Sequence, residues 1–223
     1  GYLRKLHVLD WRISWFILGG ISMFLLLTWL KLPWYYSLTG ALAFLFFPHI
    51  QGLLMVGHNT KIRALMALPL ILYSFLRFAD KRSFFSFALL TLSLSLQFRT
   101  KHYQIVFYTM LILFSIGVYY IITWIKSKES GKLLSSLSLF AGSLAVAVFM
   151  SALPLFVAGD YTPHSTRGGK AINLQEDAKG EETSGVSFEY ATRWSYSLRE
   201  YLSTIIPRAM GGTSVTVYGG DEY

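Results

Sequence analysis

Apolar residues occur along this chain in long blocks, which short polar or charged segments separate. A block of about 20 apolar residues is long enough to cross the hydrocarbon core of a bilayer as an α-helix. The pattern therefore predicts an all-α integral membrane protein with about six transmembrane helices. The expected spans are residues 11–30, 33–56, 62–78, 83–98, 103–125 and 133–157.

Three of these spans contain proline. Pro48 and His49 interrupt the second span, Pro69 should leave the third kinked or short, and Pro154 lies near the end of the sixth. Proline interrupts, kinks or shortens a helix because it removes a helical hydrogen bond. The fourth span is rich in hydroxyl side chains that can bond to neighbouring helices. These are Ser86, Thr91, Ser93 and Ser95.

The segments outside the spans differ in composition. In residues 1–10 leucines alternate with basic residues, which predicts an amphipathic segment on the membrane interface. Glycine and polar residues dominate from residue 158, and residues 188–206 regain the pattern of an amphipathic helix. We expect an interfacial segment at 1–10, a transmembrane domain at 11–157 and an extracytoplasmic segment at 158–223. We interpret the chain as an interior part of a longer one.

The composition narrows the possible partners. Charged residues make up only 14% of the chain, compared with about a quarter in soluble domains. With no cysteine, the chain has no disulfide, thiol nucleophile or cysteine zinc site. The net charge is +8, but the basic residues are spread through short loops, so we predict no nucleic-acid binding. Anionic lipid or a phosphorylated lipid substrate suits this charge better.

Short basic loops give the expected orientation in the cytoplasmic membrane. Helix parity puts Lys31 and the loops at 77–82 and 126–132 on one side, which we assign to the cytoplasm. The turns at 57–61 and 99–102, together with the segment after 158, then face outward. Basic residues are also frequent on that outer side, and a phosphate-binding site would account for them.

Three short cationic segments should meet at the outer face. Lysine supplies a point charge and arginine a two-pronged donor, so together they would clamp a phosphate or diphosphate. The alternative for each segment is a side chain that snorkels to the lipid headgroups. The segments carry His58, Asn59 and Lys61, then Arg99, His102 and Gln104, and finally Ser165, Thr166 and Arg167.

Few acidic residues are placed for catalysis. Asp10 and Asp160 lie beside the outer ends of spans, where a general base would meet a lipid-linked substrate. Asp10 is the catalytic candidate, and a helix N-cap is its alternative role. No carboxylate adjoins His58 or His102, so the sequence requires no metal, and a divalent metal is possible but unsupported.

Aromatic residues gather near the C-terminal end. Tyr190, Trp194 and Tyr196 accompany Arg193, and such a surface can stack a sugar or lie on headgroups. An amphipathic helix packed on the other helices explains the same pattern equally well.

Four segments resemble those of the YfhO family of bacterial membrane proteins, in the same order and at matching spacing. The resemblance covers about residues 40–214. It departs from the family at Ser197, where glycine is usual, and at residues 101–103, which replace a usual Asn-His-Pro. The similar positions are residues 57–61 with Ala64 and Pro69; Arg99, His102, Gln104 and Tyr108; residues 165–168; and Tyr190, Trp194, Ser195, Tyr196, Glu200, Ile206, Pro207, Gly211 and Gly212.

The resemblance implies a fold and an activity. The family belongs with the GT-C-type glycosyltransferases, which transfer a sugar from a polyprenyl-phosphate carrier to an acceptor outside the cytoplasmic membrane. The catalytic base would lie in an outer loop before Gly1. The residues that would hold the lipid phosphate are His58, Asn59, Lys61, Arg99, His102, Gln104 and Arg167. Those that would shape the sugar or acceptor pocket are Tyr108, Ser165, Thr166, Trp194, Tyr196 and Glu200.

Two other function classes stay open. A non-catalytic membrane subunit could bind anionic lipid or scaffold a larger membrane complex. A transporter is less favoured, because its charged residues are expected in the middle of spans, and none of the expected spans has one there. The expected partners are a polyprenyl-phosphate-linked sugar and membrane lipid.

Overall fold

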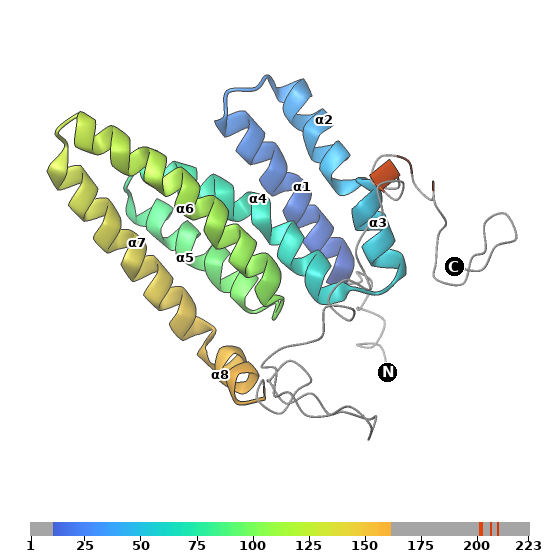
Figure 1. Ribbon diagram of the computed structural model, residues 1–223. Helices are drawn as coiled ribbons and strands as arrows, with labels where there is room; N and C mark the ends of the chain where they lie inside the picture. Colours follow the sequence, from blue (N-terminus) through green and yellow to red (C-terminus); the bar gives the residue numbers. More distant parts are fainter. Residues whose placement is uncertain (1–10, 162–200, 203–205, 207–208, 210–223) are drawn as a thin grey trace, which may run out of the picture.

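The computed structural model describes residues 11–161, 201–202, 206 and 209 (Figure 1). The described part contains eight α-helices and no strand, which confirms the all-α class there. The helices are α1 (Trp11–Trp29), α2 (Trp34–Leu45), α3 (Pro48–Met55), α4 (Asn59–Asp80), α5 (Phe84–Phe98), α6 (Tyr103–Lys126), α7 (Ser130–Met150) and α8 (Ala152–Tyr161).

Five helical segments are long and apolar enough to cross a bilayer. They are α1, α2 together with α3, α4, α6 and α7, so by length and composition five of the about six expected spans could cross a membrane. The apolar helix α5 has 15 residues. At 1.5 Å per residue it is about 22 Å long, shorter than a hydrocarbon core of about 30 Å. The fourth expected span is thus shorter than the others.

The second span is broken where proline predicts. α2 ends at Leu45, and α3 begins at Pro48 after two non-helical phenylalanines. Proline suits the first turn of a helix, where its missing N–H is not needed. Gln51 Nε2 donates a hydrogen bond to the Leu45 carbonyl oxygen over 3.0 Å. The side chain therefore satisfies a backbone acceptor that the break leaves without a helical partner.

Two helices differ in length from what the sequence predicts. α4 runs for 22 residues through Pro69, so of the two alternatives for the third span, kinked or short, the structure excludes the short one; packing against neighbouring helices maintains the helix despite the missing hydrogen bond. α7 ends at Met150 rather than at residue 157. Ser151 follows it and donates to the Ser95 carbonyl oxygen over 3.4 Å. Pro154 consequently lies in the first turn of α8, a favourable position for proline.

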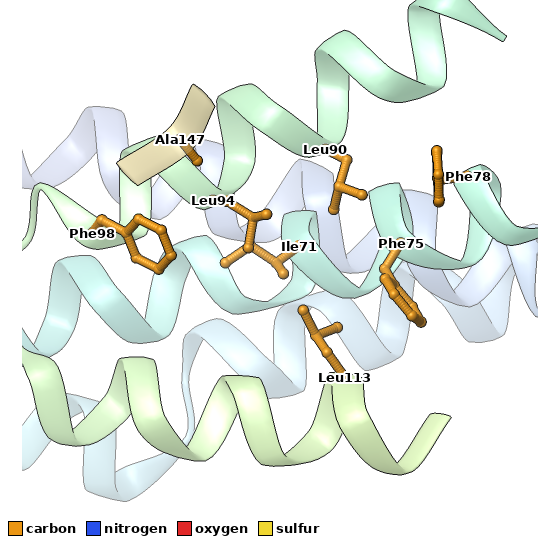
Figure 2. Packing of buried hydrophobic residues seen from close by; sticks show 8 residues of the cluster. All are labelled: Ile71, Phe75, Phe78, Leu90, Leu94, Phe98, Leu113 and Ala147. Carbon is orange, nitrogen blue, oxygen red and sulfur yellow. The ribbon is translucent and has the colours of Figure 1, made fainter. Parts of the chain in front are cut away.

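α4 is the central helix of the bundle. Of its most apolar stretch 61% is buried inside the protein, compared with 11–17% in the other four spans. Without a hydrophobic contrast between protein and lipid, close packing of this kind holds membrane helices together. The main core cluster joins α4, α5, α6 and α7 (Figure 2) and comprises Ile71, Phe75, Phe78, Leu90, Leu94, Phe98, Leu113 and Ala147.

Hydroxyl groups connect the helices inside this core. Ser74 Oγ of α4 and Ser93 Oγ of α5 lie 2.8 Å apart in a hydrogen bond, and both residues are fully buried. Ser95 Oγ reaches Met150 Sδ over 3.6 Å. The expectation that hydroxyls of the fourth span bond to neighbouring helices is confirmed at Ser93 and Ser95. Thr91 instead bonds within α5, to the Phe87 carbonyl oxygen.

The two ends of the bundle are defined by α4 and α1, which run in the same direction (Figure 1). The Arg63 guanidinium lies 3.9 Å from the centre of the Trp11 ring, and the Arg77 guanidinium lies 5.6 Å from that of Trp29. We call the end that carries residues 57–63 and 99–104 the site end. The opposite end carries residues 30–33, 80–83 and 127–129.

Gly19 lets α1 approach α4 closely. A Cβ atom at this position would lie 2.5 Å from Met66 Sδ and 3.4 Å from the Met66 Cα atom. Met66 is fully buried and has little room to move, so we expect Gly19→Ala to reduce stability by about 1–3 kcal/mol through overpacking. A lowered melting temperature in detergent would report this loss.

The matched control is Gly52→Ala in α3, where an added Cβ meets nothing within 4 Å. There alanine should leave stability unchanged or raise it, because glycine is the poorer helix former. Equal melting temperatures for the Gly19 variant and the wild type would contradict the close approach of α1 and α4.

Candidate functional site

The first cationic segment is placed by the end of α3. Gly57 adopts φ +74°, a left-handed conformation that favours glycine. The His58 N–H donates to the Leu53 carbonyl oxygen over 3.0 Å, and the Gly57 N–H to that of Leu54 over 3.3 Å, which closes α3 in a Schellman motif. The chain then turns directly into α4. His58 precedes α4 with an exposed side chain, while Asn59 and Lys61 lie half-buried in its first turn.

This turn gives a prediction about backbone strain. Open space surrounds both Gly57 and Gly52, and only Gly57 has a positive φ. We therefore expect Gly57→Ala to lose about 1 kcal/mol of stability and to lower the melting temperature, while Gly52→Ala does not. An equal response of the two variants would show that the left-handed conformation is not needed.

The second cationic segment lies between α5 and α6. Arg99 and Lys101 are exposed, whereas Thr100 between them is buried and donates to the Gln97 carbonyl oxygen over 2.6 Å. His102 Nδ1 accepts a hydrogen bond from the Ile105 N–H over 3.4 Å. His102 therefore caps the N-terminus of α6. This is a structural role, whereas the sequence predicted that His102 binds a phosphate.

Gln97 joins the helices beneath this turn. Its side chain is fully buried, and Nε2 donates to the Ala64 carbonyl oxygen of α4 over 3.1 Å and to Thr109 Oγ1 of α6 over 2.9 Å. One amide thus links α4, α5 and α6 near the site end. The sequence interpretation missed this residue. Its signal was a single amide within the otherwise apolar and hydroxyl-rich run of α5.

Two further expected site residues lie on the first turns of α6. Gln104 Nε2 donates to the Tyr108 hydroxyl oxygen over 3.1 Å, and both side chains are exposed. The spacing of four residues puts them on one face of the helix. The structure thus brings His58, Asn59, Lys61, Arg99, His102, Gln104 and Tyr108 to the same end of the bundle (Figure 1).

An arginine–tryptophan cluster adjoins these segments. Trp11, the first residue of α1, lies 3.9 Å from the Arg63 guanidinium and 5.6 Å from that of Arg12, measured to the ring centre. A guanidinium over an indole face is attracted by the negative face of the ring. The contact joins the beginning of α1 to that of α4, so α1 also contributes to the site end.

The site end has an excess of positive charge. In residues 11–161, Lys61, Arg99 and Lys101 form no ion pair, and the one ion pair described, Lys132 Nζ to Glu129 over 3.1 Å, lies at the opposite end. Of the described carboxylates, Asp80 and Glu129 also lie at the opposite end, and Asp160 lies on α8. Lysine and arginine side chains that no carboxylate neutralises can bind a phosphate.

Several expected site residues fall in other parts of the chain. Asp10, Ser165, Thr166, Arg167, Trp194, Tyr196 and Glu200 lie outside the residues that the structure describes. Within the described ranges there is no group of three or more histidine, aspartate or glutamate side chains that could hold a metal ion.

The comparisons with known proteins identify no relative. No protein-family model, curated protein or solved structure matches the chain. The resemblance to the YfhO family therefore stays a prediction from four short segments, two of which lie at the site end.

Proposed function

We propose that this chain is part of a GT-C-type glycosyltransferase that takes a sugar from a polyprenyl-phosphate carrier at the outer face of the cytoplasmic membrane. The observation that supports this most directly is the placement of two cationic segments at the same end of the bundle. Arg99 follows α5, Lys61 lies in the first turn of α4, and Gln97 hydrogen-bonds α5 to α4 just inside them. These are also two of the segments that resemble the YfhO family.

The proposed chemistry is stabilisation of a leaving phosphate. When the bond from the sugar to the carrier phosphate breaks, negative charge grows on the phosphate oxygens. Lysine and arginine close to that charge lower the barrier, because they stabilise the developing negative charge. α4 begins at Asn59 and α6 at Tyr103, within the two cationic segments, and the amides of a helix N-terminus favour an anion.

Transfer by the complete glycosyltransferase of which this chain would be part, reconstituted into vesicles with an extract of cell-envelope acceptors, tests the proposal. The vesicles would contain a polyprenyl phosphate that carries a radiolabelled sugar, and loss of label from the carrier would be measured over time. We expect label to leave the carrier in vesicles with the protein and to remain in vesicles without it. If the label stays on every carrier sugar tested, the enzyme proposal fails.

A non-catalytic membrane subunit is the second candidate. It is favoured by the small number of described carboxylates that could serve as a catalytic base. Asp80 and Glu129 lie at the opposite end, which leaves Asp160 of α8. A glycosyltransferase requires a base for the acceptor, whereas a lipid-binding subunit requires only the cations. Lipid binding that is lost in Lys61→Ala and Arg99→Ala, without sugar release by the wild type, would identify this second function.

A further inference from the structure

An apolar groove runs along α1 and α2 and reaches the joint between α2 and α3. Its volume of about 840 Å³ lies in the range of sites that hold small molecules. Ile17 and Ile21 of α1 line one side, and Leu38 and Leu42 of α2 line the other. These four side chains are 45–55% exposed, so the groove is open along its length.

The length of the groove along α1 is close to the thickness of one membrane leaflet. On α1 its lining extends from Arg12 to Phe24, a distance of about 18 Å at 1.5 Å per residue. One leaflet contributes about 15 Å to the hydrocarbon core. The groove thus begins at the site end and extends slightly past the middle of the bilayer. A single acyl chain fits this depth, whereas a polyprenyl chain would extend well beyond it.

Positive charge marks the end of the groove at the membrane surface. Arg12 is the one charged residue among its lining residues. The guanidinium groups of Arg12 and Arg63 both contact the ring of Trp11. Tryptophan favours the level of the lipid headgroups, and the guanidinium fork matches the geometry of a phosphate. The apolar lining of the groove is complementary to an acyl chain, and the arginines at its end are complementary to the phosphate of an anionic lipid.

We propose that this groove binds one acyl chain of an anionic glycerophospholipid, whose phosphate contacts Arg12 and Arg63. The site is independent of sugar transfer, since it uses none of the residues to which that chemistry is assigned. A bound lipid would fill the space between α1 and α2 and would connect both helices to the start of α4.

Native mass spectrometry of the full chain tests this site. The protein would be released from nanodiscs made of equal parts phosphatidylglycerol and phosphatidylcholine, and the lipids that stay bound would be counted. We expect one phosphatidylglycerol per chain. Ile17→Trp should reduce its retention about tenfold, because the indole fills the groove. Arg12→Gln and Arg63→Gln should each abolish most of the preference for phosphatidylglycerol, since a hydrogen bond to a charged group contributes about tenfold or more in affinity.

The matched control is Ile122→Trp on α6, which replaces an isoleucine of similar exposure, 47%, outside the groove. It should retain phosphatidylglycerol like the wild type. The proposal is overturned if Ile17→Trp retains as much lipid as the control or if the control loses as much as Ile17→Trp. It is also overturned if phosphatidylcholine binds equally well in the wild type, or if a polyprenyl phosphate or a second copy of the chain occupies the groove instead.

Discussion

Arg99→Ala is expected to reduce sugar transfer about tenfold to a hundredfold, the range that loss of one hydrogen bond to a charged group produces. The same result is expected for Lys61→Ala. Arg99 is exposed and makes no ion pair within the described residues, so its removal should not change the melting temperature. Lower transfer at unchanged stability would mean that the side chain contacts the lipid-linked phosphate rather than the rest of the protein.

Two further variants separate charge from geometry. Arg99→Lys keeps the positive charge and loses the two-pronged donor, so an intermediate rate is expected if the phosphate is held by both prongs. Lys126→Ala removes an exposed lysine at the opposite end of the bundle and should transfer sugar at the wild-type rate. A loss of transfer in Lys126→Ala as large as in Arg99→Ala would attribute both effects to the membrane surface charge and would refute a localised phosphate site.

The helical architecture follows from local properties of the sequence. Apolar blocks of spanning length form helices in a membrane because a helix satisfies its own backbone groups. The break before Pro48 is equally local, since proline cannot continue the hydrogen bonds of α2. The end of α7 was mispredicted because the apolar pattern continues to residue 157, although Pro154 has no N–H for the Met150 carbonyl oxygen and its ring clashes with that oxygen in a continuous helix. The break is thus local as well, and the Ser151 hydroxyl then bonds to the Ser95 carbonyl oxygen, 56 residues away in sequence.

The candidate site could be predicted only in part. The antiparallel order of the helices puts residues 57–61 and 99–102 at one end, and helix parity alone predicts this. Gln97 was missed because its partners are Ala64 and Thr109, on two other helices. The groove beside α1 was also missed, since an apolar side chain that lines a groove has the same sequence pattern as one that faces lipid.

Gln97→Glu is the second substitution with a large expected effect. Glutamate has the shape of glutamine but lacks the amide hydrogens that Nε2 donates to Ala64 and Thr109. The new oxygen would face the Ala64 carbonyl oxygen inside a fully buried site. A carboxylate there must either stay charged without water or take up a proton, and both outcomes are costly. We expect a loss of several kcal/mol, measured as a lower melting temperature or as failure to insert stably.

Gln104→Glu is the matched control for this substitution. It makes the same chemical change at the beginning of α6, at an exposed residue whose amide donates a hydrogen bond to the Tyr108 hydroxyl oxygen. Water and headgroups can solvate a carboxylate there, so stability should stay near that of the wild type. If Gln97→Glu is as stable as Gln104→Glu, the buried amide does not hold α4, α5 and α6 together. The turn that carries Arg99 must then be positioned by other contacts, such as the Thr100 hydroxyl on the Gln97 carbonyl.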